Sequence, residues 1–331
     1  MKPMMRPSLR QSIIRINRLS DLSGLSGPKF SDYGLLVLLA VIFGGSFVLT
    51  SVSVHEIPVI VVVTTRLAIA AAILYGAMVM AKQSLPKFGP IWWVIAAAAL
   101  LGSAAPFFLI SWAQETVDAG LAAILMAVMP LVTLVLAHMF TQDEKLNFVK
   151  VVGFLFGVFG VVVLIGFEKL GTLGDDAVRQ YALIGAAICY AGNAVITKKL
   201  LGIPRRAAAT ALVGTACLMV LPACFLFGEI PEITPSNMAI ISTIGLAIFP
   251  TAIGTLLIFE IVDRQGAAFL SQINFLVPIA GVIWGILLLS EKLPANAWLA
   301  LIIILVGVVI ARLKFNPFNK SAPKGAIKDK S

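Results

Sequence analysis

One arginine lies inside a long apolar stretch of the chain and is the residue best suited to bind a charged solute. Arg66 follows Ile57-Pro58 by about eight residues, within a run rich in Val, Ile, Ala and Leu. A guanidinium presents planar N–H donors that match a carboxylate or a phosphate, and a charge in such a run is costly unless it is paired or functional. Two interpretations stay open. Arg66 either binds an anionic group of a substrate, or it snorkels to the surface or forms an ion pair with a nearby carboxylate (Glu56, Glu115 or Asp118).

Uncharged polar and aromatic side chains in other apolar stretches are candidates for the rest of a binding cavity. Amides and hydroxyls there could hydrogen-bond a polar solute, and their alternative role is to hold neighbouring helices together. Asn193 follows Gly192 as Ser46 follows Gly45, which places both beside a backbone that can pack closely. The candidate substrate-binding residues are Arg66, Ser46, Trp112, Gln114, Tyr190, Asn193, Gln272 and Asn274.

Prolines and one carboxylate suggest how such a cavity could move. A proline inside a helix frees a backbone carbonyl and permits a kink, so we predict hinges at four prolines, with packing alone as the alternative: Pro106, Pro130, Pro250 and Pro278. Glu260 lies near the end of its apolar stretch, beside Arg264, and is a candidate for proton coupling. Its alternative is an ion pair at a solvated helix end.

The sequence lacks the residues that several other functions would require. The chain has no G-x-x-x-x-G-K-[ST] phosphate loop, and its three cysteines lie in apolar stretches. Its two histidines, His55 and His138, are far apart, so we expect no metal site, no disulfide framework and no cofactor. We find no catalytic pair and expect that the protein is not an enzyme.

The composition predicts that the bilayer is the solvent of most of the chain. Hydrophobic residues make up 60% of the 331 residues, charged residues 12%, and the mean hydropathy is +1.00. A membrane-spanning helix needs about 20 apolar residues. We therefore predict an all-α polytopic membrane protein with ten transmembrane helices at roughly 33–54, 59–81, 91–113, 117–140, 148–167, 181–200, 207–227, 238–260, 267–289 and 295–312.

The distribution of basic residues predicts the orientation. Cytoplasmic connections carry the excess of Lys and Arg. Of the 25 basic residues, Arg66 lies within a span, three lie in one set of alternate connections (Lys169, Arg179 and Lys292), and the other 21 lie in the opposite set and the tails. Both termini are therefore expected in the cytoplasm, and the net charge of +9 needs no nucleic acid partner.

Two stretches repeat one pattern and predict a duplicated fold. Residues 119–135 centre on Pro130 and precede Glu144-Lys145-Leu146, while residues 267–283 centre on Pro278 and precede Glu291-Lys292-Leu293. Five helices per copy carry the chain across the membrane, so the second copy must be inverted. We expect a basic tail at 1–31, repeats at 32–167 and 181–313, a connection at 168–180 and a basic tail at 314–331.

These features resemble the EamA-like family of the drug/metabolite transporter superfamily. The resemblance covers about residues 32–313 and rests on Asp118-Ala119-Gly120 and Gly266-Ala267-Ala268, the two central prolines, the Glu-Lys-Leu turns and the glycines Gly153, Gly157, Gly160 and Gly307. It implies ten helices in two five-helix repeats and the transport of a small molecule. Members of this family export amino acids, import vitamins or move other metabolites, so it implies no particular substrate.

The sequence therefore predicts a secondary transporter or facilitator of the inner membrane that exports a small polar metabolite, such as an amino acid, by alternating access. The expected partners are this solute and the lipid bilayer, with a proton or another coupling ion and a second copy of the chain as further candidates. Two alternatives stay open. One is an importer of a vitamin or a nucleotide-related metabolite, and the other is a membrane protein that transports nothing, such as an intramembrane enzyme or a scaffold.

Overall fold

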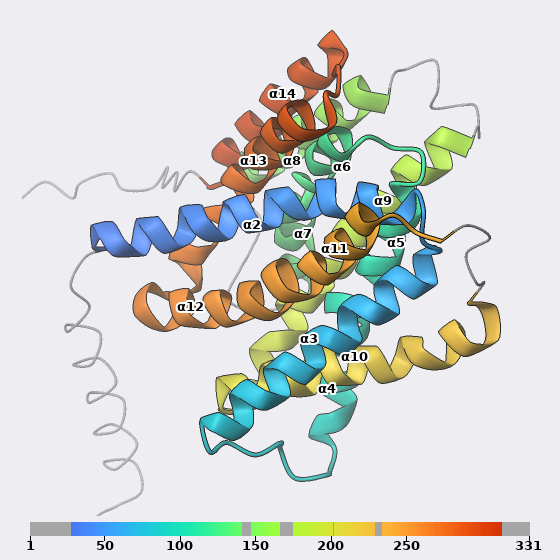
Figure 1. The fold of residues 1–331 in the computed structure, drawn as a ribbon. Coiled ribbons are helices and arrows are strands. Elements are labelled where there is room, and N and C mark those ends of the chain that lie inside the picture. Colours follow the sequence, from blue (N-terminus) through green and yellow to red (C-terminus); the bar gives the residue numbers. More distant parts are fainter. Residues whose placement is uncertain (1–27, 141–146, 166–174, 201, 229–233, 313–331) are drawn as a thin grey trace, which may run out of the picture.

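The computed structural model describes residues 28–140, 147–165, 175–200, 202–228 and 234–312 as a bundle of helices (Figure 1). All regular secondary structure in these ranges is helical. This agrees with an apolar solvent, because hydrocarbon offers no partner to a backbone N–H or C=O and a helix pairs these groups internally. Most of the predicted tails and the Glu144-Lys145-Leu146 turn lie outside the described residues.

In the first half of the chain, the described residues form seven α-helices and one π-helix. In chain order they are α2 (Phe30–Val54), α3 (Val59–Met80), α4 (Ile91–Ala99), η2 (Leu100–Ala104), α5 (Ala105–Ala113), α6 (Ala119–Met126), α7 (Met129–Phe140) and α8 (Phe148–Ile165). The second half follows a similar order. Its elements are α9 (Asp175–Ile196), η3 (Thr197–Leu200), α10 (Arg205–Phe227), α11 (Asn237–Leu246), η4 (Ala247–Ile253), α12 (Gly254–Leu270), α13 (Ile273–Leu289) and α14 (Ala295–Arg312).

Many of these helices are long and apolar enough to cross a membrane. Among the described residues, six continuous helical stretches meet both conditions: Phe30–Val54, Val59–Met80, Ile91–Ala113, Ala119–Phe140, Arg205–Phe227 and Asn237–Gly266. Three shorter helices are also strongly apolar, namely Phe148–Leu164, Ile273–Leu289 and Ala295–Ala311. The chain is therefore an all-helical membrane protein.

The helices are interrupted near the predicted hinge prolines. Pro106 follows the π-helix η2, and Pro250 lies inside the π-helix η4. Pro130 is the second residue of α7, just after the break between α6 and α7, and Pro278 lies inside α13. The structure therefore places an irregular backbone at or next to three of the four prolines, which is where a missing N–H disturbs the helical ladder.

Close helix packing is made by glycine. A Cβ atom at Gly153 of α8 would lie 2.5 Å from both the Gly307 carbonyl oxygen and the Ala311 nitrogen of α14. One at Gly44 of α2 would lie 2.6 Å from the Ala280 Cβ and 2.7 Å from the Gly281 nitrogen of α13. Small residues let helix backbones approach in this way where apolar side chains gain nothing by leaving lipid.

Polar contacts join the two halves of the chain at the helix ends. The Glu291 carboxylate accepts hydrogen bonds from the Ala119 and Gly120 N–H groups, at 2.7 and 2.8 Å, and so caps the first turn of α6. At the start of α2, the Asp32 carboxylate accepts from the Gln265 amide at 2.7 Å and lies 3.8 Å from Arg264 of α12. Side-chain contacts of Asp32 and of Glu291 thus join the two halves of the bundle at two places.

We expect Gly153→Ala to destabilise the protein by about 1–3 kcal/mol, because the added methyl group would collide with the backbone of α14. Gly76→Ala in α3 is the matched control, since nothing lies within 4 Å of a Cβ atom there. The thermal midpoint of each purified variant in detergent measures the effect. Equal midpoints for the two variants would contradict the tight α8–α14 contact.

Candidate functional site

Arg66 is buried in the middle of the bundle. It is the eighth residue of α3, about 11 Å along the helix axis from its first residue, and its side chain is 7% exposed. The guanidinium carbon lies 3.6 Å from the centre of the Phe107 ring of α5. Its Nε donates a hydrogen bond of 2.7 Å to the Thr251 hydroxyl of η4. Residues from both halves of the chain therefore hold this one cation.

The three carboxylates expected as partners of Arg66 are engaged elsewhere or exposed. Glu56 accepts from the Ser236 N–H at 2.6 Å and from its hydroxyl at 2.8 Å, and these bonds lower the pKa of the Glu56 carboxyl. Glu115 forms an ion pair with Arg179. Asp118 is exposed at the start of α6. Arg66 pairs with none of the three, and its burial also rules out snorkelling to the surface in this conformation.

The Thr251 hydroxyl is fixed by two bonds. It donates to the Leu246 carbonyl at 2.7 Å and accepts from Arg66 Nε at the same distance. Thr251 is 2% exposed, so both bonds are shielded from water. Because an sp³ hydroxyl has one proton to donate, its bond to Leu246 leaves its lone pairs for the arginine.

Thr251 and Phe107 were not among the candidates from the sequence, although a signal for them exists. Each follows a helix-interrupting proline, Pro250 and Pro106 respectively, and each lies in or beside a π-helix. The two π-helices begin at Leu100 and Ala247, which reproduces the spacing of about 147 residues between the repeated patterns. In both halves, the residue that directly follows the proline at such a break could therefore have been chosen as a candidate from the sequence.

One of the predicted aromatic residues, Tyr190, lies close to this arginine. Trp112 and Tyr190 each pack against both large apolar clusters of the bundle, one built around α6, α9 and α14 and the other around α3 and α10. Tyr190 is near enough to the Arg66 guanidinium to interact with it electrostatically. The Trp112 ring is also covered by the Arg179 guanidinium, 4.1 Å from its centre.

Two predicted amides carry buried oxygen atoms that accept no hydrogen bond. Gln114 is fully buried and donates through Nε2 to the Phe47 carbonyl at 2.9 Å, while its Oε1 has no partner in the described protein. Asn193 lies on α9 one helical turn after Tyr190, against Gly102 of η2, and its Oδ1 is likewise unpaired there. Buried acceptors without a partner are uncommon and available to a donor on a bound solute or water.

The structure does not bring the remaining candidates to Arg66. The Ser46 hydroxyl donates to the Phe43 carbonyl of its own helix at 2.6 Å. Gln272 is exposed at the break before α13, and Asn274 is partly exposed one residue into that helix. Glu260 forms an exposed ion pair of 2.7 Å with Arg264. In the ranges described, no cluster of three or more His, Cys, Asp or Glu side chains could hold a metal ion.

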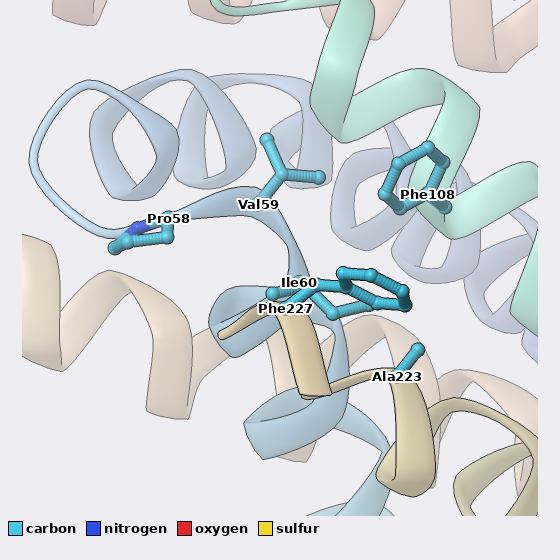
Figure 2. Close-up of a pocket in the computed structure, with 6 residues that line it drawn as sticks. All are labelled: Pro58, Val59, Ile60, Phe108, Ala223 and Phe227. Atoms are coloured by element: carbon cyan, nitrogen blue, oxygen red, sulfur yellow. The ribbon is translucent and has the colours of Figure 1, made fainter. Parts of the chain in front are cut away.

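An apolar pocket among the described residues is not lined by the arginine. Its volume is about 400 Å³, and Figure 2 shows its lining by Pro58, Val59, Ile60, Phe108, Ala223 and Phe227. A second pocket of about 290 Å³ shares Ile60, Phe108 and Ala223 with it and reaches η2. Phe227 is 75% exposed and Phe108 40% exposed, so the groove opens on the outside of the bundle. It offers no polar group for a charged solute.

Comparison with known proteins identifies the family. The model of the EamA-like transporter family matches residues 32–166 and again residues 180–313. The uncharacterized transporter YoaV of Bacillus subtilis (strain 168) is 23% identical over 286 residues, covering 85% of this chain and 96% of the relative. A probable amino-acid metabolite efflux pump of Escherichia coli (strain K12) is 25% identical over 289 residues, covering 84% and 94%.

Two further comparisons concern the membrane and the fold. The uncharacterized inner membrane transporter YedA of Escherichia coli (strain K12) is 23% identical and covers 85% of this chain and 90% of its own length. A solved crystal structure of a protein with 19% identity superposes with a TM-score of 0.59, covering 86% of this chain and 98% of that one. With an all-helical membrane fold and a family model that matches twice along its length, this protein belongs to the EamA-like transporter family.

Proposed function

We propose that this protein is a secondary transporter that exports a small polar metabolite with an anionic group, such as an amino acid, by alternating access. Arg66 binds the anionic group in this proposal. The observation that carries it is a buried guanidinium that lies between the two halves of the chain and has no carboxylate partner among the described residues.

The energetics of Arg66 favour an anionic ligand. Burying an unpaired charge costs several kcal/mol, whereas a cation–π contact contributes about 1–2 kcal/mol and a hydrogen bond to a charged group about 1.5–3 kcal/mol. Of the five N–H groups of the guanidinium, the Nε–H alone has a hydrogen-bond acceptor in the described structure. A carboxylate on the terminal nitrogens would supply both the missing charge and the missing acceptors.

Two buried amides of the bundle support a solute that also carries donors. Gln114 Oε1 and Asn193 Oδ1 are buried acceptors, which would suit an ammonium group. The name of the Escherichia coli relative, a probable amino-acid metabolite efflux pump, points to the same class of solute and to export. At 25% identity it supports the class and leaves the individual substrate open.

The proposed topology has ten transmembrane helices in two inverted five-helix repeats, with both termini in the cytoplasm. The excess of basic residues in one set of connections supports this orientation. In this topology, α4–η2–α5 and α6–α7 each form one bent span of the first repeat, and α11–η4–α12 is the equivalent of α4–η2–α5 in the second.

Alternating access requires the halves to separate at one side while they stay joined at the other. Glu291 at α6 would fasten the outer side, and Asp32 with Arg264 and Gln265 the inner side. The breaks at Pro106, Pro130 and Pro250, together with Pro278, are where we propose that the spans bend. The Glu260–Arg264 ion pair makes Glu260 a weaker candidate for proton coupling than it was from sequence, because its charge already has a partner.

The orientation can be tested with single cysteines in a protein whose Cys189, Cys217 and Cys224 are replaced by serine. Thr116 and Lys87 are both exposed in connections between helices. We expect a membrane-impermeant maleimide to label Thr116→Cys in intact cells and Lys87→Cys only after permeabilisation, because the basic connections face the cytoplasm. Labelling of Lys87→Cys in intact cells would refute the proposed topology.

The anion site can be tested by counterflow of a panel of L-amino acids in proteoliposomes. We expect Arg66→Ala to reduce exchange at least about tenfold, since a charged hydrogen bond is lost. Arg66→Lys should also reduce it, because Lys keeps the charge and loses the planar pair of donors. Arg206→Ala, at an exposed arginine at the start of α10, is the control and should exchange normally. Full exchange by folded Arg66→Ala protein would remove Arg66 from the site, and no exchange by the unmodified protein would argue against the amino acid class.

A further inference from the structure

We propose that Thr251 is the positioning residue of the anion site, and that it turns Arg66 so that both terminal nitrogens face a carboxylate. This inference rests on the proposed function of Arg66. It assigns to Thr251 a role in binding that it exerts through the arginine, without contact to the solute.

The argument begins with the proline before Thr251. In a regular helix the Leu246 carbonyl would accept the N–H four residues later, but that residue is Pro250, which has no N–H. In the π-helix η4 this carbonyl faces the N–H of the residue five positions later, Thr251. The Thr251 hydroxyl donates to the same carbonyl at 2.7 Å, which ties its side chain to the widened turn.

The two bonds of the Thr251 hydroxyl agree in direction. The Arg66 guanidinium has donors only, so its Nε–H donates to the Thr251 oxygen at 2.7 Å, while the single hydroxyl proton is donated to the Leu246 carbonyl. A chain of two hydrogen bonds thus runs from the arginine to the backbone of η4, at the turn that contains Pro250.

The Phe107 ring restricts the guanidinium in the remaining direction. One face of the group lies against this ring at 3.6 Å, so it cannot tilt toward α5. With Nε held by Thr251 and a face held by Phe107, the edge that carries the two terminal nitrogens stays free. That edge forms paired, parallel bonds to the two oxygens of a carboxylate, which a spherical anion cannot use.

A solely structural role for Thr251 predicts a different behaviour. If Thr251 only satisfies the Leu246 carbonyl, its loss should lower stability and leave the affinity for anions unchanged. Thr243 of α11 offers a matched comparison, because it is 4% exposed and donates to the Ala239 carbonyl of its own helix at 2.9 Å, with no contact to Arg66.

The experiment measures thermal stabilisation of the purified, detergent-solubilised protein by propionate at constant ionic strength, with the neutral propionamide as the matched probe. We expect propionate, and not propionamide, to raise the midpoint of the unmodified protein and of Thr243→Val. Thr251→Val should weaken propionate binding about tenfold, and Thr251→Ser, which keeps the hydroxyl, should restore it. Thr251→Ala replaces the valine variant if that variant does not fold.

The double variant isolates the positioning effect. In an Arg66→Ala background propionate should give only residual stabilisation, and Thr251→Val should change it no further, because the hydroxyl acts through the arginine. Unchanged propionate affinity in Thr251→Val, or an equal loss with and without Arg66, would overturn the positioning role and leave the anion site standing. No stabilisation of the unmodified protein by propionate would overturn both proposals together.

Discussion

An apolar solvent cannot pair with backbone polar groups, and the architecture of this protein follows from that constraint. Described residues in the spans are helical because a helix pairs its N–H and C=O groups internally. Where a proline removes an N–H from the ladder, the helix must pair the remaining groups in another way. At Pro250 the chain forms the π-helix η4, and the Thr251 hydroxyl donates to the Leu246 carbonyl and accepts from Arg66. A defect of the backbone thereby becomes part of the candidate site.

The same constraint explains why the arginine is held by residues of both halves. A buried cation needs acceptors and a polarisable surface, and for Arg66 both come from other helices. Thr251 comes from the second half and Phe107 from the first, each one residue after a proline. Any separation of α3 from η4 would break the bond to Thr251. If the proposed anion site exists, its occupancy and the arrangement of the two halves are therefore physically linked.

Glycines determine how closely the helices pack. Glycines in α2, α8, α13 and α14 bring helix backbones within reach of each other, and a single added methyl group would not fit at several of them. The polar contacts between the halves lie at the helix ends. Glu291 caps the first turn of α6, where the N–H groups point at its carboxylate, and burial raises the pKa of this Glu291 carboxyl. Desolvation of the carboxylate thus opposes its own capping bonds.

Composition and periodicity by themselves determined that the protein is helical and belongs in the bilayer, where most of its spans lie, and which family it belongs to. Each of these follows from local hydropathy and from repeated motifs. They also singled out Arg66, since a charge in an apolar run is conspicuous without any structure. They could not choose among its partners. The candidate carboxylates Glu56 and Glu115 bind Ser236 and Arg179 instead, while Thr251 is 185 positions away from Arg66. Only the tertiary structure decided this, because the packing of α3 against η4 and α5 sets which side chains reach the guanidinium.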